Sequence, residues 1–151
     1  MADARTKVAQ AALMATAQDT EAAFYEALQQ GDADRLMSLW SDDDEVACVH
    51  PGGPRLVGQG SIRVAFEAIL QAGGLNIVPV NVRCVEGPGC SVHHVLEKVQ
   101  ALTDKGLQTA YVLATNVYVR TGHGWRMVAH HASPGQPDEM QEMIEAGSVL
   151  H

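Results

Sequence analysis

The sequence predicts an α+β fold in which helices pack on one face of a curved antiparallel sheet. The first half of the 151-residue chain has apolar residues at helical spacing, whereas long segments rich in Val and other strand formers follow residue 76. Short glycine-containing turns separate these segments, so consecutive strands should pair as hairpins. Because the helices precede the hairpins instead of alternating with them, we expect all helices on one side of a single domain.

The first helix is predicted from an apolar stripe with spacings of four, three, four and four residues: Leu13, Ala17, Thr20, Phe24 and Leu28. Gly31 is a typical helix stop, and Asp32 is a suitable cap for a short second helix that ends near Trp40. The acidic residues 42–45 lack the alternating spacing of a calcium loop, so a solvated turn is expected there.

A short strand and a third helix come next. Residues 46–50 form the strand, and the Pro- and Gly-rich residues 51–54 turn the chain sharply. Residues 58–61 open the third helix, which ends at Gly73 and Gly74. The long strands are then expected at residues 77–86, 91–103, 107–121 and 125–133.

Charge and cysteine usage exclude several classes of function. Ten Lys and Arg against eighteen Asp and Glu give a formal net charge of −8, and the basic residues are scattered singly. Nucleic acids and anionic membrane surfaces select a basic face, so neither partner is expected.

Three cysteines without CxxC spacing favour a reducing cytoplasm. Residues 15–17 resemble a signal-peptidase site, but Gln10 interrupts the apolar run before them, and a cytoplasmic location is favoured.

Several segments together resemble a known family. The last hairpin and the turn after the first strand are similar to the SnoaL-like branch of the nuclear transport factor 2-like superfamily, through residues 114–118, 124–128, 130–134, 50–51, 56–58 and the helix from Ile62. The resemblance covers about residues 20–134. It implies a cone-shaped nuclear transport factor 2-like fold, with three N-terminal helices on the concave face of the sheet.

The resemblance also suggests a division of the chain. We expect an N-terminal helical extension at residues 1–17, a SnoaL-like domain at 18–134 and a C-terminal tail at 135–151. The superfamily includes isomerases, dehydratases, epoxide hydrolases, polyketide cyclases, transport factors and dimerisation modules. The fold alone therefore does not choose a function.

In such a cone the ligand pocket lies at the mouth, so inward-facing strand residues are the candidate site. Residues of a strand alternate between its two faces. With residues 122–123 as the last turn, and the bulky Trp125 and Met127 assigned to the core, Asn116, Tyr118 and His131 face inward. Pairing Thr103 with Leu107 extends this register to the preceding strand, where His94 then faces inward and His93 and Glu97 face outward.

His131 is the candidate general acid or base, because an imidazole titrates near neutral pH. Asn116 is the candidate hydrogen-bond donor to a developing oxyanion. The alternative is that these two side chains only satisfy each other and nearby backbone. The candidate ligand-binding residues are Trp40, His50, His94, Tyr118 and Met127.

No metal and no cofactor are expected. The neighbours in His93–His94 and in His130–His131 point to opposite faces of their strand, so neither pair can chelate one ion. A site would need His94 and His131 plus a carboxylate, and the register places Glu97 outward. The family's better-known enzymes use an aspartate base, and no Asp lies within a predicted strand. If the chain is an enzyme, His131 must carry the proton.

Three hypotheses of function remain open. The leading one is a domain that binds a small apolar or mixed-polarity molecule in the cone. The first alternative is a cofactor-free lyase, isomerase or cyclase that uses His131. Given a cavity, His131→Ala should weaken ligand binding or activity, whereas His130→Ala should leave both nearly unchanged. The second alternative is a noncatalytic dimerisation module.

A homodimer through the convex face of the sheet is expected under each hypothesis. The late strands carry apolar residues on both faces, and the helices can cover only one. The outward set predicted from the register is Leu113, Val117, Val119, Val128 and Val95. An exposed apolar patch of this kind usually marks an interface, and a two-fold contact would bury it against itself.

Overall fold

The helices begin and end at residues suited to these positions. In this computed structural model, which describes residues 14–137 and 141–144, α2 (Ala17–Gln30) starts with a capping box between Thr16 and Asp19. Gly31 ends α2 with a left-handed φ of 69°, and the Asp32 side chain caps α3 (Ala33–Ser38), as the sequence predicts. The third described helix is α4 (Gln59–Ile69). Residues 1–13 of the predicted N-terminal extension lie outside the described residues.

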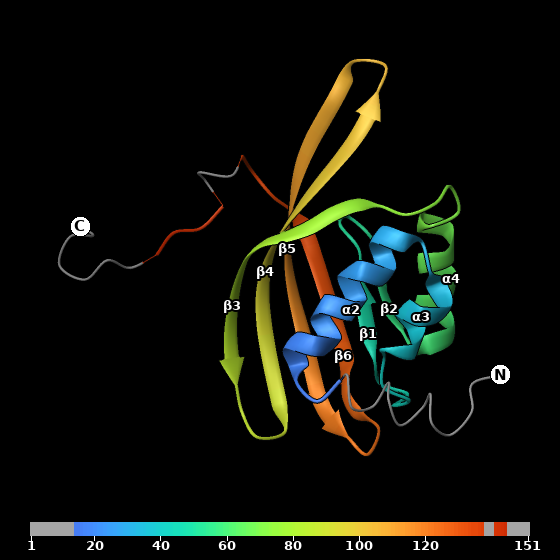
Figure 1. The fold of residues 1–151 in the computed structure, drawn as a ribbon, viewed down its shortest axis with the longest axis vertical. Helices are drawn as coiled ribbons and strands as arrows, with labels where there is room; N and C mark the ends of the chain where they lie inside the picture. Colours follow the sequence, from blue (N-terminus) through green and yellow to red (C-terminus); the bar gives the residue numbers. More distant parts are fainter. Residues whose placement is uncertain (1–13, 138–140, 145–151) are drawn as a thin grey trace.

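In the described part of the chain, six strands form one sheet in the order β2-β1-β6-β5-β4-β3 (Figure 1). Their bounds are β1 Ala47–Val49, β2 Arg55–Val57, β3 Asn76–Glu86, β4 Cys90–Thr103, β5 Gly106–Thr121 and β6 Gly124–Pro134. The four long strands each match the predicted ranges to within one residue. The sheet is mixed and not wholly antiparallel, because β1 runs parallel to β6.

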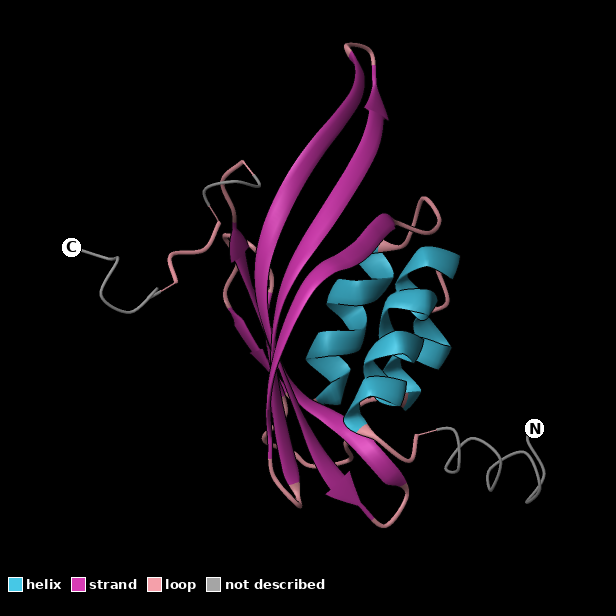
Figure 2. Ribbon diagram, turned by 60° about the vertical axis from the view of Figure 1, so that its left-hand side comes forward, coloured by secondary structure: helices cyan, strands magenta, loops and turns pink. Residues whose placement is uncertain are grey.

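The three helices lie together on one side of the twisted sheet, and the α+β fold is confirmed (Figure 2). The core lies between the two layers, where Phe24 from α2, Ile62 from α4 and Met127 from β6 are fully buried. None of the helices in the described residues is both long and apolar enough to cross a membrane.

The directions in which strand residues point differ from the prediction at two places. Val117 pairs with Ala129 but Tyr118 pairs with Met127, so β6 has a bulge at Val128. The extra residue changes the alternation: Met127 and His130 are both buried, and His131 is exposed. The expectation that His131 faces inward is therefore wrong.

The β4–β5 register is displaced by one residue from the predicted one. Thr103 pairs with Gly106, and not with Leu107. A slip of one residue exchanges the two faces of a strand. Consequently His93, Val95 and Glu97 are buried inside, whereas His94 is exposed on the opposite face.

Only some of the apolar residues predicted for the convex face lie on it. Leu113, Val117 and Val119 are half-buried on this face. Val95 is instead in the core, and Val128 packs against the core cluster. Beyond this surface the β4–β5 hairpin extends away from the rest of the sheet (Figure 1), with Leu102 84% and Leu107 60% exposed.

The end of α2 makes a close backbone contact that we expect to be intolerant of substitution. A Cβ on Gly74 would lie 2.7 Å from the carbonyl carbon of Gln29, so Gly74→Ala should destabilise the protein by about 1–3 kcal/mol. Gly60 lies within α4 with open space around it, so Gly60→Ala should stabilise by about 0.5–1 kcal/mol. Urea denaturation of both variants checks this, and equal effects would contradict the contact.

Candidate functional site

A buried carboxylate, that of Glu21 on α2, collects hydrogen bonds from two strands. The Tyr118 hydroxyl donates to Glu21 Oε2 at 2.8 Å, and His93 Nδ1 lies 2.9 Å from the same oxygen. The Asn116 amide nitrogen approaches it at 3.4 Å. Tyr118, His93 and Asn116 are each fully buried. These contacts join α2 to β4 and β5.

A chain of hydrogen bonds leads from Asn116 to two further residues. The Asn116 Nδ2 group donates to the Tyr25 hydroxyl at 3.0 Å, and this hydroxyl donates to Glu97 Oε2 at 2.6 Å. On the other side, Asn116 Oδ1 lies 2.5 Å from His130 Nδ1. Because an amide oxygen only accepts, Nδ1 of His130 carries the hydrogen and its Nε2 is the unprotonated nitrogen.

Glu97 and His130 border a cavity of about 190 Å³. The wall comes from α2, α4, the four long strands, and the loops after β1 and α4. It is mainly apolar, and its residues are Leu28, His50, Pro51, Phe66, Ile69, Leu75, Ile77, Glu97, Val99, Val112, His130 and Ala132. The arrangement is a mostly apolar chamber with a carboxyl group and imidazoles on its wall, which is typical of a small-molecule site.

Burial changes the ionisation of both polar groups. It raises the pKa of the Glu97 carboxyl to about 7, an effect that the Tyr25 hydrogen bond opposes and the Glu21 charge reinforces. Burial also lowers the pKa of His130 to about 3, with further lowering by His50 and His131. At neutral pH, His130 is therefore uncharged, and Glu97 exchanges between its acid and carboxylate forms.

The structure brings only some of the predicted site residues together. Asn116 and Tyr118 lie in the buried network, and His50 lines the cavity, where its ring contacts Phe66 edge-on with centroids 4.8 Å apart. Trp40 and Met127 are core residues, joined by an isolated bridge, and neither lines this cavity.

Two predicted residues, His94 and His131, lie on the other face of the sheet. Both line a pocket of about 280 Å³ on the convex side with Thr115, and His94 Nδ1 is 3.4 Å from the Thr115 hydroxyl. The β6 bulge and the β4–β5 register account for this placement. Neither side chain contacts the cavity described above.

Five residues of the network were absent from the candidate site predicted from sequence: Glu21, Tyr25, His93, Glu97 and His130. A signal for the first two exists in the sequence. Glu21, Tyr25 and Leu28 recur at spacings of four and three, which places them on one side of α2. The correct β4–β5 register would have been enough to place His93 and Glu97 on the inner face of the sheet.

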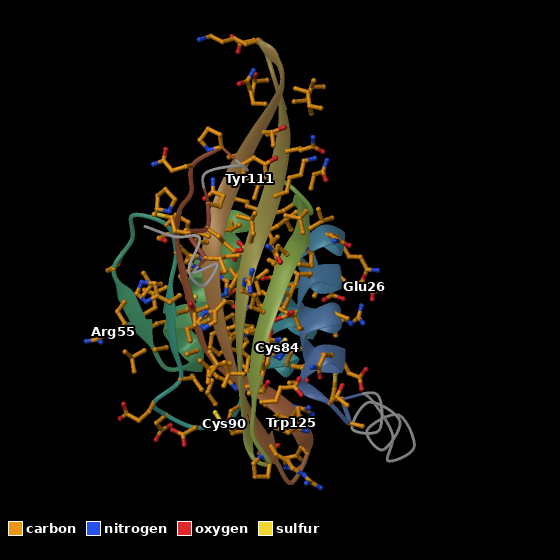
Figure 3. All side chains as sticks on the ribbon, turned by 90° about the vertical axis from the view of Figure 1, so that its left-hand side faces the viewer. Glu26, Arg55, Cys84, Cys90, Tyr111 and Trp125 are labelled. Atoms are coloured by element: carbon orange, nitrogen blue, oxygen red, sulfur yellow. The ribbon has the colours of Figure 1, made fainter. Side chains whose placement is uncertain are left out.

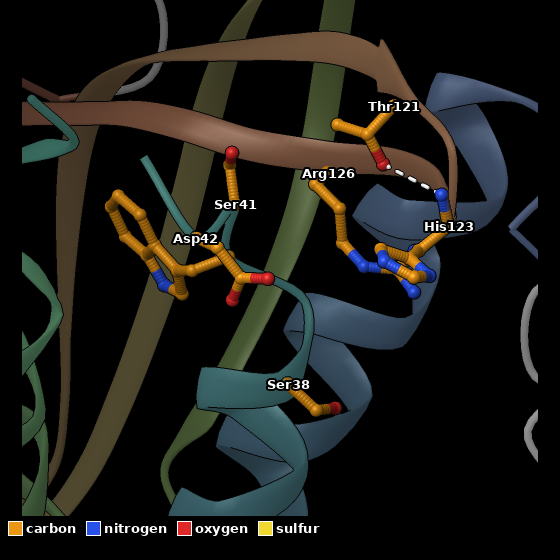
Figure 4. A pocket seen from close by; sticks show the side chains of 7 residues that line it. Ser38, Ser41, Asp42, Thr121, His123 and Arg126 are labelled. Carbon is orange, nitrogen blue, oxygen red and sulfur yellow. Dashed lines mark hydrogen bonds between the residues drawn. The ribbon is translucent and has the colours of Figure 1, made fainter. Parts of the chain in front are cut away.

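A second, more polar pocket of about 240 Å³ lies at the β5–β6 turn (Figure 4). Ser38, Asp42, His123 and Arg126 line it, and the Thr121 hydroxyl accepts a hydrogen bond from the backbone N–H of His123. Trp40 also borders it, and the indole N–H of Trp40 has no hydrogen-bond partner among the described residues. The buried acid–base pair belongs to the other cavity, which we therefore take as the candidate site.

The sequence model of the SnoaL-like domain matches residues 18–137. The chain belongs to the SnoaL-like domain family. No curated protein matches this SnoaL-like chain. Solved structures that are similar to it include proteins from three bacteria, and their sequence identities range from 33% down to 20%.

A presumed calcium/calmodulin-dependent protein kinase type II association domain from Thiobacillus denitrificans is 33% identical, with a TM-score of 0.74; the match covers 82% of this chain and 98% of that one. A presumed dehydratase of the nuclear transport factor 2-like family from Streptomyces avermitilis is 30% identical, with a TM-score of 0.68 and coverage of 87% and 98%. An uncharacterised protein with a cystatin-like fold from Caulobacter vibrioides is 20% identical, with a TM-score of 0.68 and coverage of 80% and 88%.

The raised pKa of Glu97 predicts a pH-dependent stability. Between about pH 4.5 and about pH 7, the folded SnoaL-like domain holds a proton that the unfolded chain has released, so its stability falls as the pH rises. Glu97→Gln removes this titration. The free energy of unfolding of the variant, relative to wild type, should therefore rise across this window by up to about 1.4 kcal/mol per pH unit and level off above it.

Urea denaturation at several pH values measures this difference. The exposed Glu67→Gln is the matched control. A Glu97→Gln difference that stays constant with pH would show that Glu97 ionises as an ordinary carboxyl group.

Proposed function

We propose that this SnoaL-like domain binds a small, mostly apolar, uncharged molecule in the cavity beside Glu97 and His130. The observation that carries the proposal is the apolar wall with these two hydrogen-bonding groups on it. A volume of about 190 Å³ is below the range usual for drug-sized ligands, so a compact molecule fits best.

The charges of the wall support an uncharged ligand. Among the described residues, the cavity lining contains no Lys or Arg to pair with an anion. His130 is neutral and presents the unprotonated Nε2 as an acceptor, and the protonated form of Glu97 presents a donor. A ligand with a hydroxyl group for His130 and a carbonyl or hydroxyl group for Glu97 would match both.

The two adjacent histidines of β6 provide a matched test. His130→Gln should weaken ligand binding, because it replaces the acceptor on the cavity wall, whereas His131→Gln on the convex face should bind as wild type. Loss of one hydrogen bond corresponds to about 0.5–1.5 kcal/mol, or roughly a 2- to 13-fold increase in Kd. Native mass spectrometry of the purified protein, mixed with a library of small neutral ketones and alcohols, would identify ligands. Calorimetric titration would then measure the Kd of each ligand for both variants.

Equal affinity in the two variants would contradict the assignment of the cavity as the binding site. An equal loss in both would contradict it as well. Thermal unfolding of both variants shows whether they are folded at the temperature of the titration.

A second candidate function is cofactor-free proton transfer, with Glu97 in the role that the sequence suggested for His131. Its support is the Glu97 pKa of about 7, which lets one side chain act as both acid and base at neutral pH. The likeness to a presumed dehydratase from Streptomyces avermitilis also supports it. His131 has no contact with the cavity.

A substrate that shows turnover would distinguish catalysis from binding. Under this candidate function, kcat should depend on a single ionisation near pH 7, and Glu97→Gln should lower kcat by about 10²–10⁴-fold with little change in KM. Binding without turnover in wild type, or turnover that Glu97→Gln leaves intact, would count against catalysis by Glu97.

We also propose that the domain forms a homodimer through its convex face. Leu113, Val117 and Val119 lie there, and the β4–β5 hairpin adds Leu102 and Leu107, which are register partners. A two-stranded hairpin alone is marginally stable in water, so contact with a second copy would stabilise this one. The similarity to a presumed kinase association domain from Thiobacillus denitrificans supports self-association.

Val117→Lys should therefore convert the dimer to monomer, because it places a charge in the centre of the apolar surface. Val64→Lys is the matched control, since Val64 is 67% exposed on α4 at the other side of the molecule. Light scattering at micromolar concentration measures the mass. A wild-type protein that is already monomeric, or a dimer that survives Val117→Lys, would refute this interface.

A further inference from the structure

Three potential metal ligands of different chemical type meet outside the cavity. Cys84 and Glu86 are on β3 and His93 is on β4, where Cys84 pairs directly with His93 and Glu86 pairs with Ser91. Residues two apart on a strand share a face, so all three side chains lie on the side of the sheet that carries α2 (Figure 3 shows Cys84 beside this helix). One ligand atom from each lies within 4.8 Å of the others.

We propose that Cys84, Glu86 and His93 form a binding site for Zn²⁺. A thiolate, an imidazole and a carboxylate are the three ligand types that zinc accepts in proteins, and a tetrahedral site with three protein ligands keeps a fourth position for water. The harder ions Mg²⁺ and Ca²⁺ prefer sets of oxygen ligands, which makes the sulfur of Cys84 unsuitable for them.

The buried Glu21 carboxylate gives His93 the orientation that a zinc ligand needs. Zinc-binding histidines usually donate their second ring N–H to a carboxylate or carbonyl, which fixes the tautomer and makes the ligating nitrogen more basic. His93 Nδ1 lies 2.9 Å from Glu21 Oε2, so in the neutral ring Nδ1 carries the hydrogen and Nε2 has the lone pair. The Ser91 hydroxyl, 2.9 Å from Nε2, is the group that the ion would displace or share.

The site is also open to an ion from solvent. His93 is fully buried, but Cys84 and Glu86 are exposed, so these two side chains are free to rotate towards a common centre. Such a movement is needed, because zinc lies about 2.0–2.3 Å from nitrogen and sulfur ligands. Glu86 contacts Gln18 here, and both line a surface pocket of about 280 Å³ that also includes Ser91.

Cobalt is the probe for this site, because Co²⁺ replaces Zn²⁺ in tetrahedral sites and is visible by absorption. Titration of the reduced full-length chain with Co²⁺ should give a thiolate-to-cobalt charge-transfer band and the intense visible bands of tetrahedral cobalt, at one ion per chain. Zn²⁺ should then remove both. This readout does not depend on a ligand in the cavity, because none of the three residues lines it.

Variants at two exposed positions identify the ligands. Cys84→Ser should abolish the charge-transfer band, and Glu86→Gln should weaken Co²⁺ binding while keeping the band. Cys90→Ser is the matched control, since Cys90 is also an exposed cysteine but lies on the other face of β4. Glu21→Gln should weaken Co²⁺ binding by about 10–100-fold, the usual cost of losing a carboxylate behind a metal-binding histidine.

The absence of the charge-transfer band in wild type would overturn the site. A band that survives Cys84→Ser, or one that Cys90→Ser removes, would overturn it as well. Circular dichroism without metal establishes that each variant is folded. If Cys84→Ser is unfolded, an unchanged cobalt affinity in Glu86→Gln is the outcome that refutes the proposal.

Discussion

The interior of this SnoaL-like domain depends on a buried negative charge. A carboxylate is stable inside a protein only when several donors replace the water that it has lost, and leaving a buried polar group without its hydrogen bond costs about 1–3 kcal/mol, or more for a charged group. Glu21 meets this requirement with Tyr118, His93 and Asn116, which come from two different strands. The helix therefore cannot slide or rotate on the sheet without breaking these bonds, and the polar network fixes the packing of α2.

The same network determines what the cavity can do. Each donor and acceptor in it has one consistent direction, from His130 through Asn116 and Tyr25 to Glu97. The position of the lone pair on His130 follows from its bond to Asn116 behind the cavity wall. The partly protonated state of the Glu97 carboxyl follows mainly from burial, which the Tyr25 hydrogen bond opposes. The charge of Glu21 adds to the raised pKa of Glu97 although Glu21 does not line the cavity. A substitution of Glu21 would thus change the chemistry of a cavity that this residue does not line.

Strand and helix boundaries could be predicted from the sequence because local residues determine them. Gly31, Asp32 and the glycine turns act within a few residues, and the four long strands follow from them closely. The face of the sheet on which an individual residue lies could not be predicted from the sequence, because it depends on pairing between strands. One bulge at Val128 and one register step between β4 and β5 exchanged His131 for His130 and His94 for His93. Glu21 was missed for another reason: a glutamate on a helix is usually solvated, and only its partners on distant strands explain its burial.

The bulge at Val128 has a consequence for how this domain tolerates insertions and deletions. In most strands, deletion of one residue would replace an inward side chain with an unrelated one. Here two identical residues, His130 and His131, stand next to each other where the bulge ends. Deletion of Val128 would close the bulge and leave His130 opposite Asn116. If Val128 instead stayed in regular pairing after Met127, Ala129 would lie opposite Asn116, and His131 would point inward opposite Ala114. The doubled histidine therefore keeps an imidazole on the inner face in both cases, but only the first case keeps the hydrogen bond to Asn116.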